Sequence, residues 1–421
     1  MSKNNNNTPR LRFPGFTGEW EEKKLGDIGD TYNGLTGKSK EDFDNGNAKF
    51  ITFLNVLKNV VVDTNILGVV NVKDGEKQNR VQCGDMLFNT SSETPEEVGF
   101  CSVFSSDTEV PVYLNSFCFG YRYKDKSKYI PLFLAYYLRS SCGRQLMHKL
   151  AQGITRFNLS KEYFNKAVVY YPSPEEQEKI ASCLSAMDDL IAAQAEKVEV
   201  LKEKKTGLMQ QLFPQPGETT PRLRFPEFTG EWVEKKLGEV APVIFDGTHQ
   251  TPHYVNSGIP FYSIENIVSN KPCKFITENE HRINTSKNKT ERGDILISRI
   301  GTIGFAKIVD WDGEFSTYVS LATIKKSAFI HTEYLYAYLQ SDYYQKEIRS
   351  KSLMNAVPCK INMEDLKKTI VLLPSSPAEQ KKIADCLSEL DSLIASETKQ
   401  LEALKDHKKG LMQQLFPQPA K

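Results

Sequence analysis

The sequence predicts an α+β protein with two tandem domains of mixed helices and strands, each followed by one long helix. Two observations lead to this prediction. Residues 173–216 return as residues 376–419 without a gap, and both copies end in GLMQQLFPQP. Residues 8–27 return as residues 220–239, and both copies begin with TPRLRFP. A chain of 421 residues is too long for one core. The chain is therefore an internal duplication of a leader, a globular region and a helix.

Each helical segment carries its own start and stop signals. Ser173 and Ser376 stand at N-cap positions, each followed by a proline at the first helical position. A glutamate three residues after each serine is typical of a capping box. Phe213 and Phe416 end the segments, because the proline after each disfavours helical conformation in the residue before it. The roughly 40 residues between these signals correspond to helices about 60 Å long.

Apolar residues recur along both helices with the 4-3 spacing of a heptad repeat. A sustained seam of this kind predicts a coiled coil. Two unrelated surface helices on separate cores are the alternative. Two polar residues interrupt each copy, namely Gln194 and Lys205, then Glu397 and Lys408. The apolar positions are Ile180, Leu184, Met187, Ile191, Val198, Leu201, Leu208 and Leu212, then Ile383, Leu387, Leu390, Ile394, Leu401, Leu404, Leu411 and Leu415.

Composition narrows the class of protein. The formal net charge of +1, from 54 basic and 53 acidic residues, is weak support for a nucleic-acid binder. The polar start MSKNNNNTPR predicts no signal peptide, and no apolar run is long enough to span a bilayer. Eight cysteines without a C-x-x-C pair indicate reduced thiols and a cytoplasmic location. We expect no metal site and no catalytic constellation in this chain.

The two globular regions share landmarks between divergent stretches. Residues 84–89 (GDMLFN) correspond to 293–298 (GDILIS), residues 132–138 to 334–339, and residues 157–159 to 361–363. The predicted boundaries are 1–172 for the first domain with its leader, 173–217 for the first helix, 218–375 for the second domain with its leader, and 376–421 for the second helix. Strands are expected at 50–54, 98–104, 118–123 and 259–264. Helices are expected near 130–150 and 332–350, and after Ser160 and Asn362.

These motifs together resemble the specificity (S) subunit of type I restriction–modification systems over essentially the full length. They are the PxLRFPxFxGEW leaders, the GDIL-type turns and the SPxEQxKIAxCLSxxDxLI helices. The second region also carries FDGTHQTP at 245–252, whereas the first has YNGLTGKS at 32–39, so their targets should differ. The resemblance implies two target-recognition domains, antiparallel pairing of the helices and pseudo-two-fold symmetry.

The same resemblance implies a non-catalytic subunit that reads a bipartite, gapped site in double-stranded DNA. It implies two adenine-methyltransferase (M) subunits as partners, which carry S-adenosylmethionine. It also implies two restriction (R) subunits, which are translocase–nucleases that use ATP and Mg. No cofactor is expected on the chain itself.

Candidate DNA-contacting residues lie in Gly-, Thr- and Asn-rich loops with basic neighbours. Thr, His and Gln side chains can hydrogen-bond to base edges, whereas basic residues more often bind phosphates. For each candidate, a solvated loop residue is the alternative interpretation. The candidates are Asn33, Lys38, Ser39, Lys40, Thr90, Ser91, Arg156 and Asn158 in the first half, and Thr248, His249, Gln250, Arg299, Thr302, Lys351, Asn355 and Lys360 in the second.

Antiparallel pairing that places Ile180 opposite Leu415 brings no two polar seam positions together. Lys205 then faces Leu390, and Lys408 faces Met187. Unpaired charges would damage a dry seam, so these side chains either extend past it or meet a partner. We favour a methyltransferase docking surface. Its expected residues are Ile180, Leu184, Met187, Ile191, Lys205, Leu208, Ile383, Leu387, Leu390, Ile394, Lys408 and Leu411.

Two rival functions remain open from the sequence. A coiled-coil scaffold without DNA recognition would show no salt-sensitive DNA affinity. A stand-alone enzyme would need a titratable constellation, which we do not find. Residues 34–39 (GLTGKS) only partly match a phosphate-binding loop, because Tyr32 occupies the position of its first glycine. The family motifs favour DNA recognition.

Overall fold

The structure is a computed structural model that describes residues 7–269 and 271–417. The chain divides into two compact units. Unit 1 comprises Met1–Gln194 and Gln400–Lys421, and unit 2 comprises Ala195–Lys399. Helices α6 (Pro174–Leu212) and α13 (Pro377–Gln414) each contribute to both units. The polar start at 1–6 and the last residues of the second predicted helical segment, 418–421, lie outside the described residues.

Unit 1 is built on a four-stranded antiparallel sheet in the order β2-β9-β5-β7. Two three-stranded sheets, β4-β3-β8 and β10-β11-β6, and the pair β1-β12 accompany it. Its other elements, in chain order, are β1 (Glu21–Lys24), α1 (Leu25–Ile28), β2 (Gly29–Asn33), η1 (Lys40–Asp42), β3 (Phe43–Ile51), α2 (Phe53–Lys58), η2 (Thr64–Ile66), β4 (Gly68–Val70), β5 (Asp85–Asn89), β6 (Ser91–Ser92), β7 (Cys101–Phe104), β8 (Val112–Leu114), β9 (Cys118–Tyr123), α3 (Pro131–Arg139), α4 (Ser141–Leu150), β10 (Ala151–Gln152), β11 (Phe157–Leu159), α5 (Lys161–Lys166) and β12 (Val168–Tyr171).

Unit 2 repeats this plan with a four-stranded antiparallel sheet in the order β14-β20-β17-β18. The sheet β16-β15-β19 and the pair β13-β21 accompany it. Its other elements are β13 (Val233–Lys236), α7 (Leu237–Val240), β14 (Ile244–Asp246), β15 (Ile259–Tyr262), α8 (Ile264–Ser269), β16 (Lys274–Ile276), α9 (Glu278–Asn284), β17 (Ile295–Ser298), β18 (Ala306–Ile308), β19 (Ser316–Thr317), β20 (Leu321–Ile324), α10 (Thr332–Leu339), α11 (Asp342–Ser350), α12 (Met363–Lys367) and β21 (Ile370–Leu373).

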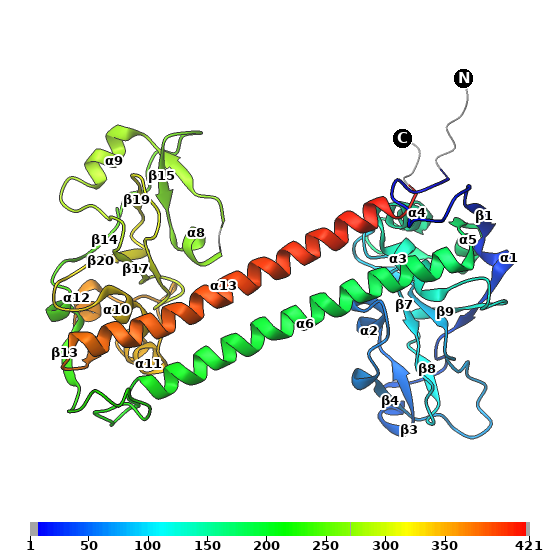
Figure 1. The fold of residues 1–421 in the computed structure, drawn as a ribbon, viewed down its shortest axis with the longest axis horizontal. Helices are drawn as coiled ribbons and strands as arrows, with labels where there is room; N and C mark the ends of the chain where they lie inside the picture. The colour runs from blue at the N-terminus through cyan, green and yellow to red at the C-terminus, as the bar shows by residue number, and fades with distance from the viewer. Residues whose placement is uncertain (1–6, 270, 418–421) are drawn as a thin grey trace. The chain divides into compact units, whose positions relative to one another are not determined.

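The C-terminal end of a long helix lies at the globular part of each unit (Figure 1), and the phenylalanine after it belongs to that unit's core. In unit 1 the Phe416 ring, fully buried, packs on Phe133 and Tyr137 of α3, with centroid distances of 5.7 and 5.6 Å. In unit 2 the Phe213 ring packs in the same way on Tyr334 and Tyr338 of α10, at 5.8 and 5.5 Å. The LMQQLFP segment that ends each long helix thus supplies the phenylalanine that packs on the aromatic rings of its unit.

The helices pair antiparallel within each unit, as the family resemblance implies. In unit 2, Lys197 Nζ lies 2.7 Å from Glu397 Oε1, and Lys205 Nζ lies 2.6 Å from Asp391 Oδ1. Residue numbers therefore rise along α6 as they fall along α13. Lys408 forms the equivalent pair with a carboxylate of α6 in unit 1. The predicted fold class is confirmed.

The two seam lysines extend past the apolar seam to the facing helix. Lys205 was expected opposite Leu390 and instead bonds the next residue, Asp391. Lys408 was expected opposite Met187 and bonds the next residue on α6. Their side chains are only 15% and 17% exposed, and each charge is neutralised within the chain. The pairing register is therefore as predicted, while docking of a methyltransferase at these residues stays a prediction.

The repeated SPxEQ segment fastens each long helix to its domain. Ser173 Oγ accepts from the Glu176 backbone N–H at 3.4 Å, as an N-cap does. The glutamate does not complete a capping box, which corrects the expectation. Its carboxylate, 2% exposed, accepts two hydrogen bonds from Arg12 of the leader, at 2.9 and 2.6 Å. Arg224 and Glu379 repeat the arrangement in unit 2.

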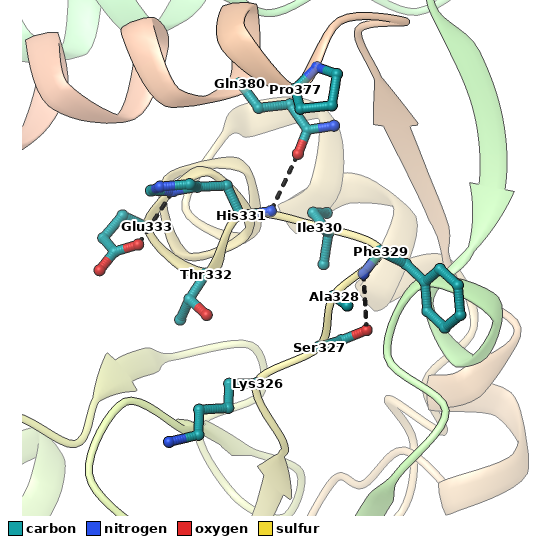
Figure 2. Close-up of a pocket in the computed structure, with 10 residues that line it drawn as sticks. All are labelled: Lys326, Ser327, Ala328, Phe329, Ile330, His331, Thr332, Glu333, Pro377 and Gln380. Atoms are coloured by element: carbon teal, nitrogen blue, oxygen red, sulfur yellow. Dashed lines mark hydrogen bonds and ion pairs between the residues drawn. The ribbon is translucent and has the colours of Figure 1, made fainter.

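The glutamine of the motif holds the start of the next helix. Gln177 Oε1 accepts from the Ile130 backbone N–H at 2.9 Å, just before α3. Gln380 Oε1 accepts from the His331 backbone N–H at 3.0 Å, just before α10. Figure 2 shows this contact at the wall of a pocket that also includes residues 326–333 and Pro377. The pocket contains none of the predicted DNA-contacting residues.

Several predicted elements differ in detail from the observed ones. The strand at 118–123 and the helices after Ser160 and Asn362 are confirmed. The helices expected at 130–150 and 332–350 are each two helices, because Ser140 and Ser341 act as N-caps of α4 and α11. The strands expected at 50–54, 98–104 and 259–264 are shorter than predicted or displaced, and α2 and α8 begin within or at the end of two of these ranges.

Candidate nucleic-acid interface

Two predicted residues of unit 1 meet at one edge of its central sheet. Asn33 ends β2 and pairs with Phe119 at the start of β9. Strand β5 ends beside the same part of β9, since Asn89 pairs with Cys118. Thr90 follows directly, and its Oγ1 donates to the Phe117 carbonyl oxygen at 2.7 Å. Asn33 and Thr90 are distant in sequence but lie along one rim of the sheet.

A small hairpin extends this rim. Strands β10 and β11 pair antiparallel, and β11 also pairs with β6, which places Asn158 opposite Ser91. Arg156 Nη2 donates to Ser91 Oγ at 3.4 Å. Lys161 donates to Asn33 Oδ1 and closes the group. The residues Asn33, Thr90, Ser91, Arg156, Asn158 and Lys161 are called the first rim. Lys161, the first residue of α5, is not among the residues predicted from the sequence.

The other three candidates of the first half, Lys38, Ser39 and Lys40, do not take part in the contacts that form the first rim. Lys38 is 5% exposed at its side chain, and its ammonium donates to Glu76 at 2.6 Å and to the Asn71 carbonyl oxygen at 2.7 Å. This hydrogen bond, with others, lowers the pKa of the Glu76 carboxyl to about 2. Ser39 bonds Asp42 in the cap of η1. The geometry gives Lys38 and Ser39 structural roles, whereas Lys40 is exposed.

Unit 2 gathers its candidates at the equivalent edge. Gly247 approaches the backbone so closely that an added Cβ would lie 2.1 Å from the Thr317 carbonyl oxygen. Thr248 follows, and its N–H donates to that oxygen at 2.9 Å. Asp246 Oδ2 then joins His249 Nε2 at 2.9 Å and Arg299 Nη1 at 2.8 Å. Gln250 is exposed on the same loop.

A second hairpin extends this edge in the same way. Lys360 bridges both Ile300 and Leu353. Asn355 lies in the loop between Leu353 and Lys360, and both it and Lys360 are exposed. The residues Thr248, His249, Gln250, Asn355 and Lys360 are called the second rim. Of the remaining candidates, Thr302 is exposed next to Gly301, which donates to the Cys359 carbonyl oxygen at 2.9 Å, and Lys351 lies 3.4 Å from Glu347 on α11.

The hydrogen bonds correct one landmark of the duplication. Leu159 N–H donates to the Thr90 carbonyl oxygen at 2.8 Å, and Ile361 N–H donates to the Arg299 carbonyl oxygen at 2.9 Å. Leu159 therefore corresponds to Ile361, two residues away from the sequence-based match of 157–159 with 361–363. The correct match also aligns Ser160 with Asn362, which precede α5 and α12.

Arg299 has a positioning role in this arrangement. Its side chain is 9% exposed and pairs with Asp246. It also donates to the carbonyl oxygens of Ile361 and Val319, at 3.2 and 3.3 Å. These bonds connect the second hairpin to the loop that carries Thr248, so Arg299 supports the second rim and is not exposed on it. The sequence suggested a DNA contact because Arg299 is a basic residue beside the glycine and threonine of a predicted loop.

The exposed groups of both rims are hydrogen-bonding side chains with a few cations. Arg156 in the first rim and Lys360 in the second can bind phosphates, and the neighbouring exposed amides can bond base edges, whereas Ser91 is buried. Among residues 7–269 and 271–417, no group of three or more His, Cys, Asp or Glu side chains could hold a metal ion. Within the same residues, no helix is long and apolar enough to cross a membrane.

Comparison with known proteins identifies the family. The model of the "Type I restriction modification DNA specificity domain" matches residues 17–203 and 229–406. The chain belongs to this family. As a specificity subunit of a type I restriction–modification system, it is a non-catalytic DNA-recognition subunit with two specificity domains.

Individual relatives agree with this assignment. The type I restriction enzyme MjaIX specificity subunit of Methanocaldococcus jannaschii is 22% identical over 94% of this chain and 92% of its own. The MjaVIII specificity subunit of the same organism is 26% identical over 62% of this chain and 63% of its own.

Solved structures share the fold. The S subunit of a type I restriction–modification system from M. genitalium aligns with a TM-score of 0.60 and 17% identity, over 98% of this chain and all of its own. A chain from the structure titled "Structural basis underlying complex assembly and conformational transition of the type I R-M system" aligns at 0.57 and 16% identity, over 96% and 98%.

Proposed function

We propose that each unit reads one half of a bipartite, gapped DNA target, and that the chain positions two methyltransferase subunits on it. The observation that carries the proposal is that both units place different side chains on equivalent rims of one shared frame. Asn158 of the first rim, for example, corresponds to Lys360 of the second. Two different readers on one frame suit two different half-sites.

The long helices suit the task of setting the gap. The ion pair of Lys205 with Asp391 recurs as Lys408 with Asp188, and the members of each pair are related by the internal repeat. Such reciprocity is typical of an approximate two-fold axis between paired helices. DNA has local two-folds of its own, so two readers that the family resemblance relates by such an axis would match opposite strand senses.

The partners and their cofactors follow from the family resemblance. The methyltransferase subunits would bring S-adenosylmethionine and modify one adenine in each half-site. Two restriction subunits would bring ATP and Mg for translocation and cleavage. The chain itself would supply binding and positioning only. A scaffold that assembles proteins without DNA contact is the rival interpretation of the sequence, and membership of the DNA specificity family counts against it.

The pattern of N6-methyladenine in genomic DNA tests the proposal directly. We expect cells with this gene and its methyltransferase partner to show one asymmetric, gapped motif that is lost on deletion of the gene. Restoring the gene is the control. An unchanged pattern, although this chain co-purifies with the methyltransferase, would contradict DNA recognition and favour the scaffold.

The length of the helices offers a second test. One added heptad after Glu196 and another after Lys399, near the middle of the seam by the observed register, would lengthen both helices by about 10 Å. This corresponds to about three base pairs of duplex. We expect methylation at a target whose gap is longer by about that number, with both half-sites unchanged. Altered bases within a half-site would refute the spacer role.

A further inference from the structure

The two hairpins that extend the rims are attached to their units in the same way. The first hairpin, residues 151–159, is fixed to β6 through the pair of Asn158 with Ser91. The second hairpin, residues 353–361, is fixed through the bridge of Lys360 with Ile300. Ser91 and Ile300 each follow closely after the central strand of their unit, β5 or β17. Each hairpin thus projects from the edge at which its sheet presents the rim.

Each hairpin carries a large aliphatic side chain that nothing in its unit covers. Ile154 is 93% exposed and Val357 is 100% exposed, more than any other large apolar side chain of the described residues. Gly153 keeps the first loop tight, because its φ is +129° and an added Cβ would lie 2.0 Å from the Arg156 carbonyl oxygen. Ile154 follows Gly153 directly in this loop and is almost fully exposed.

Folding does not account for these two side chains. A fully exposed side chain buries no apolar area and so contributes no hydrophobic stabilisation. Single exposed apolar residues are common on proteins. Here, however, the two most exposed ones occupy the loops of corresponding hairpins whose sequences differ, AQGITRFNL against LMNAVPCKI. Each also stands beside exposed polar rim residues, Arg156 in one loop and Asn355 in the other.

We propose that each hairpin enters the major groove of its half-site and that its aliphatic tip packs on the 5-methyl group of a thymine. The proposal rests on the proposed function. The major groove is wide enough for a two-stranded ribbon, and apolar contact with the thymine methyl is one of the ways in which a base pair is read there. A half-site that contains a methylated adenine also contains the thymine opposite it.

Within each hairpin, different side chains would contact the phosphates and the bases. Arg156 and Lys360 would approach phosphates while Ile154 and Val357 reach the bases. Removing one buried methyl group costs about 0.8 kcal/mol, which is roughly a four-fold loss of affinity. Truncating Ile154 to alanine removes more buried carbon, so its expected loss at the cognate half-site is about ten-fold.

The test combines protein truncation with removal of the DNA methyl group. The complex of the full chain with its methyltransferase is titrated against a cognate duplex in which single thymines are replaced by deoxyuridine. We expect one replacement in the half-site of unit 1 to weaken binding by about four-fold. In Ile154→Ala the same replacement should have no further effect. Val357→Ala should show this loss of coupling only in the other half-site.

Controls separate this inference from the proposed function. Ile66→Ala removes the same type of side chain, 53% exposed, from η2 in unit 1, and should bind like the parent. Equal deoxyuridine penalties in the parent and in Ile154→Ala would overturn the methyl contact. Unchanged binding by both tip variants would overturn it too, while sequence-specific binding would still uphold the proposed function. Absence of sequence-specific binding by the parent complex would instead refute the proposed function.

Discussion

Arg224, in the leader of unit 2, should stabilise the start of α13 by several kcal/mol. Arg224 donates two hydrogen bonds to Glu379, both at 2.8 Å, and the glutamate side chain is only 1% exposed. Arg224→Ala would leave a buried carboxylate without its cation. Breaking a buried pair from one side typically costs about 3–5 kcal/mol. The lower value corresponds to amide exchange about 100-fold faster at the start of α13, if local opening governs exchange there.

The measurement is hydrogen exchange of residues 376–387 in the full chain. Arg222→Ala is a matched control, because this neighbouring arginine forms an exposed pair with Glu218 whose expected value is below about 1 kcal/mol. The double variant Arg224→Leu with Glu379→Leu removes both charges and should recover most of the protection. Equal exchange in Arg224→Ala and Arg222→Ala would refute the fastening role of the leader.

Three further predictions concern the seam, pH and backbone packing. The double variant Lys205→Leu with Lys408→Leu should change the free energy of unfolding by less than about 1 kcal/mol, because the carboxylate partners of the two lysines are 43% and 35% exposed and stay hydrated. Loss of methyltransferase co-purification in this variant would show that the methyltransferase docks at these two lysines. Burial lowers the pKa of His281, so at acid pH the folded state binds fewer protons than the unfolded state. The stability of unit 2 in urea titrations should therefore fall as the pH drops below about 6.5, and it should fall less in His281→Gln. Gly247→Ala should destabilise unit 2 by about 1–3 kcal/mol in the same titrations, because the added Cβ meets the Thr317 carbonyl; a neutral effect would show that this loop adjusts.

The sequence was sufficient for those features whose signals are local or repeated. The N-cap serines, the terminating prolines and the heptad spacing predicted the bounds of α6 and α13 to within a few residues. The duplication predicted the two-unit plan, and the hydrophobic register predicted the positions opposite Lys205 and Lys408 to within one residue. Such signals involve residues close in sequence or a period that survives in both copies, so one chain suffices to read them.

The rest depends on partners far away in sequence. Glu176 looked like a capping residue because its true partner, Arg12, lies 164 positions earlier. Lys38 and Arg299 looked like DNA contacts because a basic loop residue is usually exposed, and only the fold brings Glu76 and Asp246 to them. The aliphatic hairpin tips escaped notice for the opposite reason, since an apolar residue in a sequence is normally assigned to a core.

The buried side chains that hold the helices in place are the same in both units, whereas the exposed side chains of the two rims differ. Gln177 and Gln380 make the same backbone contact, because both must hold the helix that receives the long-helix end. By contrast Asn158 and Lys360 correspond in position and differ in charge. An exposed rim side chain that packs on no core can be replaced with little effect on the free energy of unfolding. Replacing one of the buried glutamines would disturb the helix that it anchors. The frame can therefore keep one geometry while each rim varies independently, and exchange of one hairpin should alter recognition by its own unit alone.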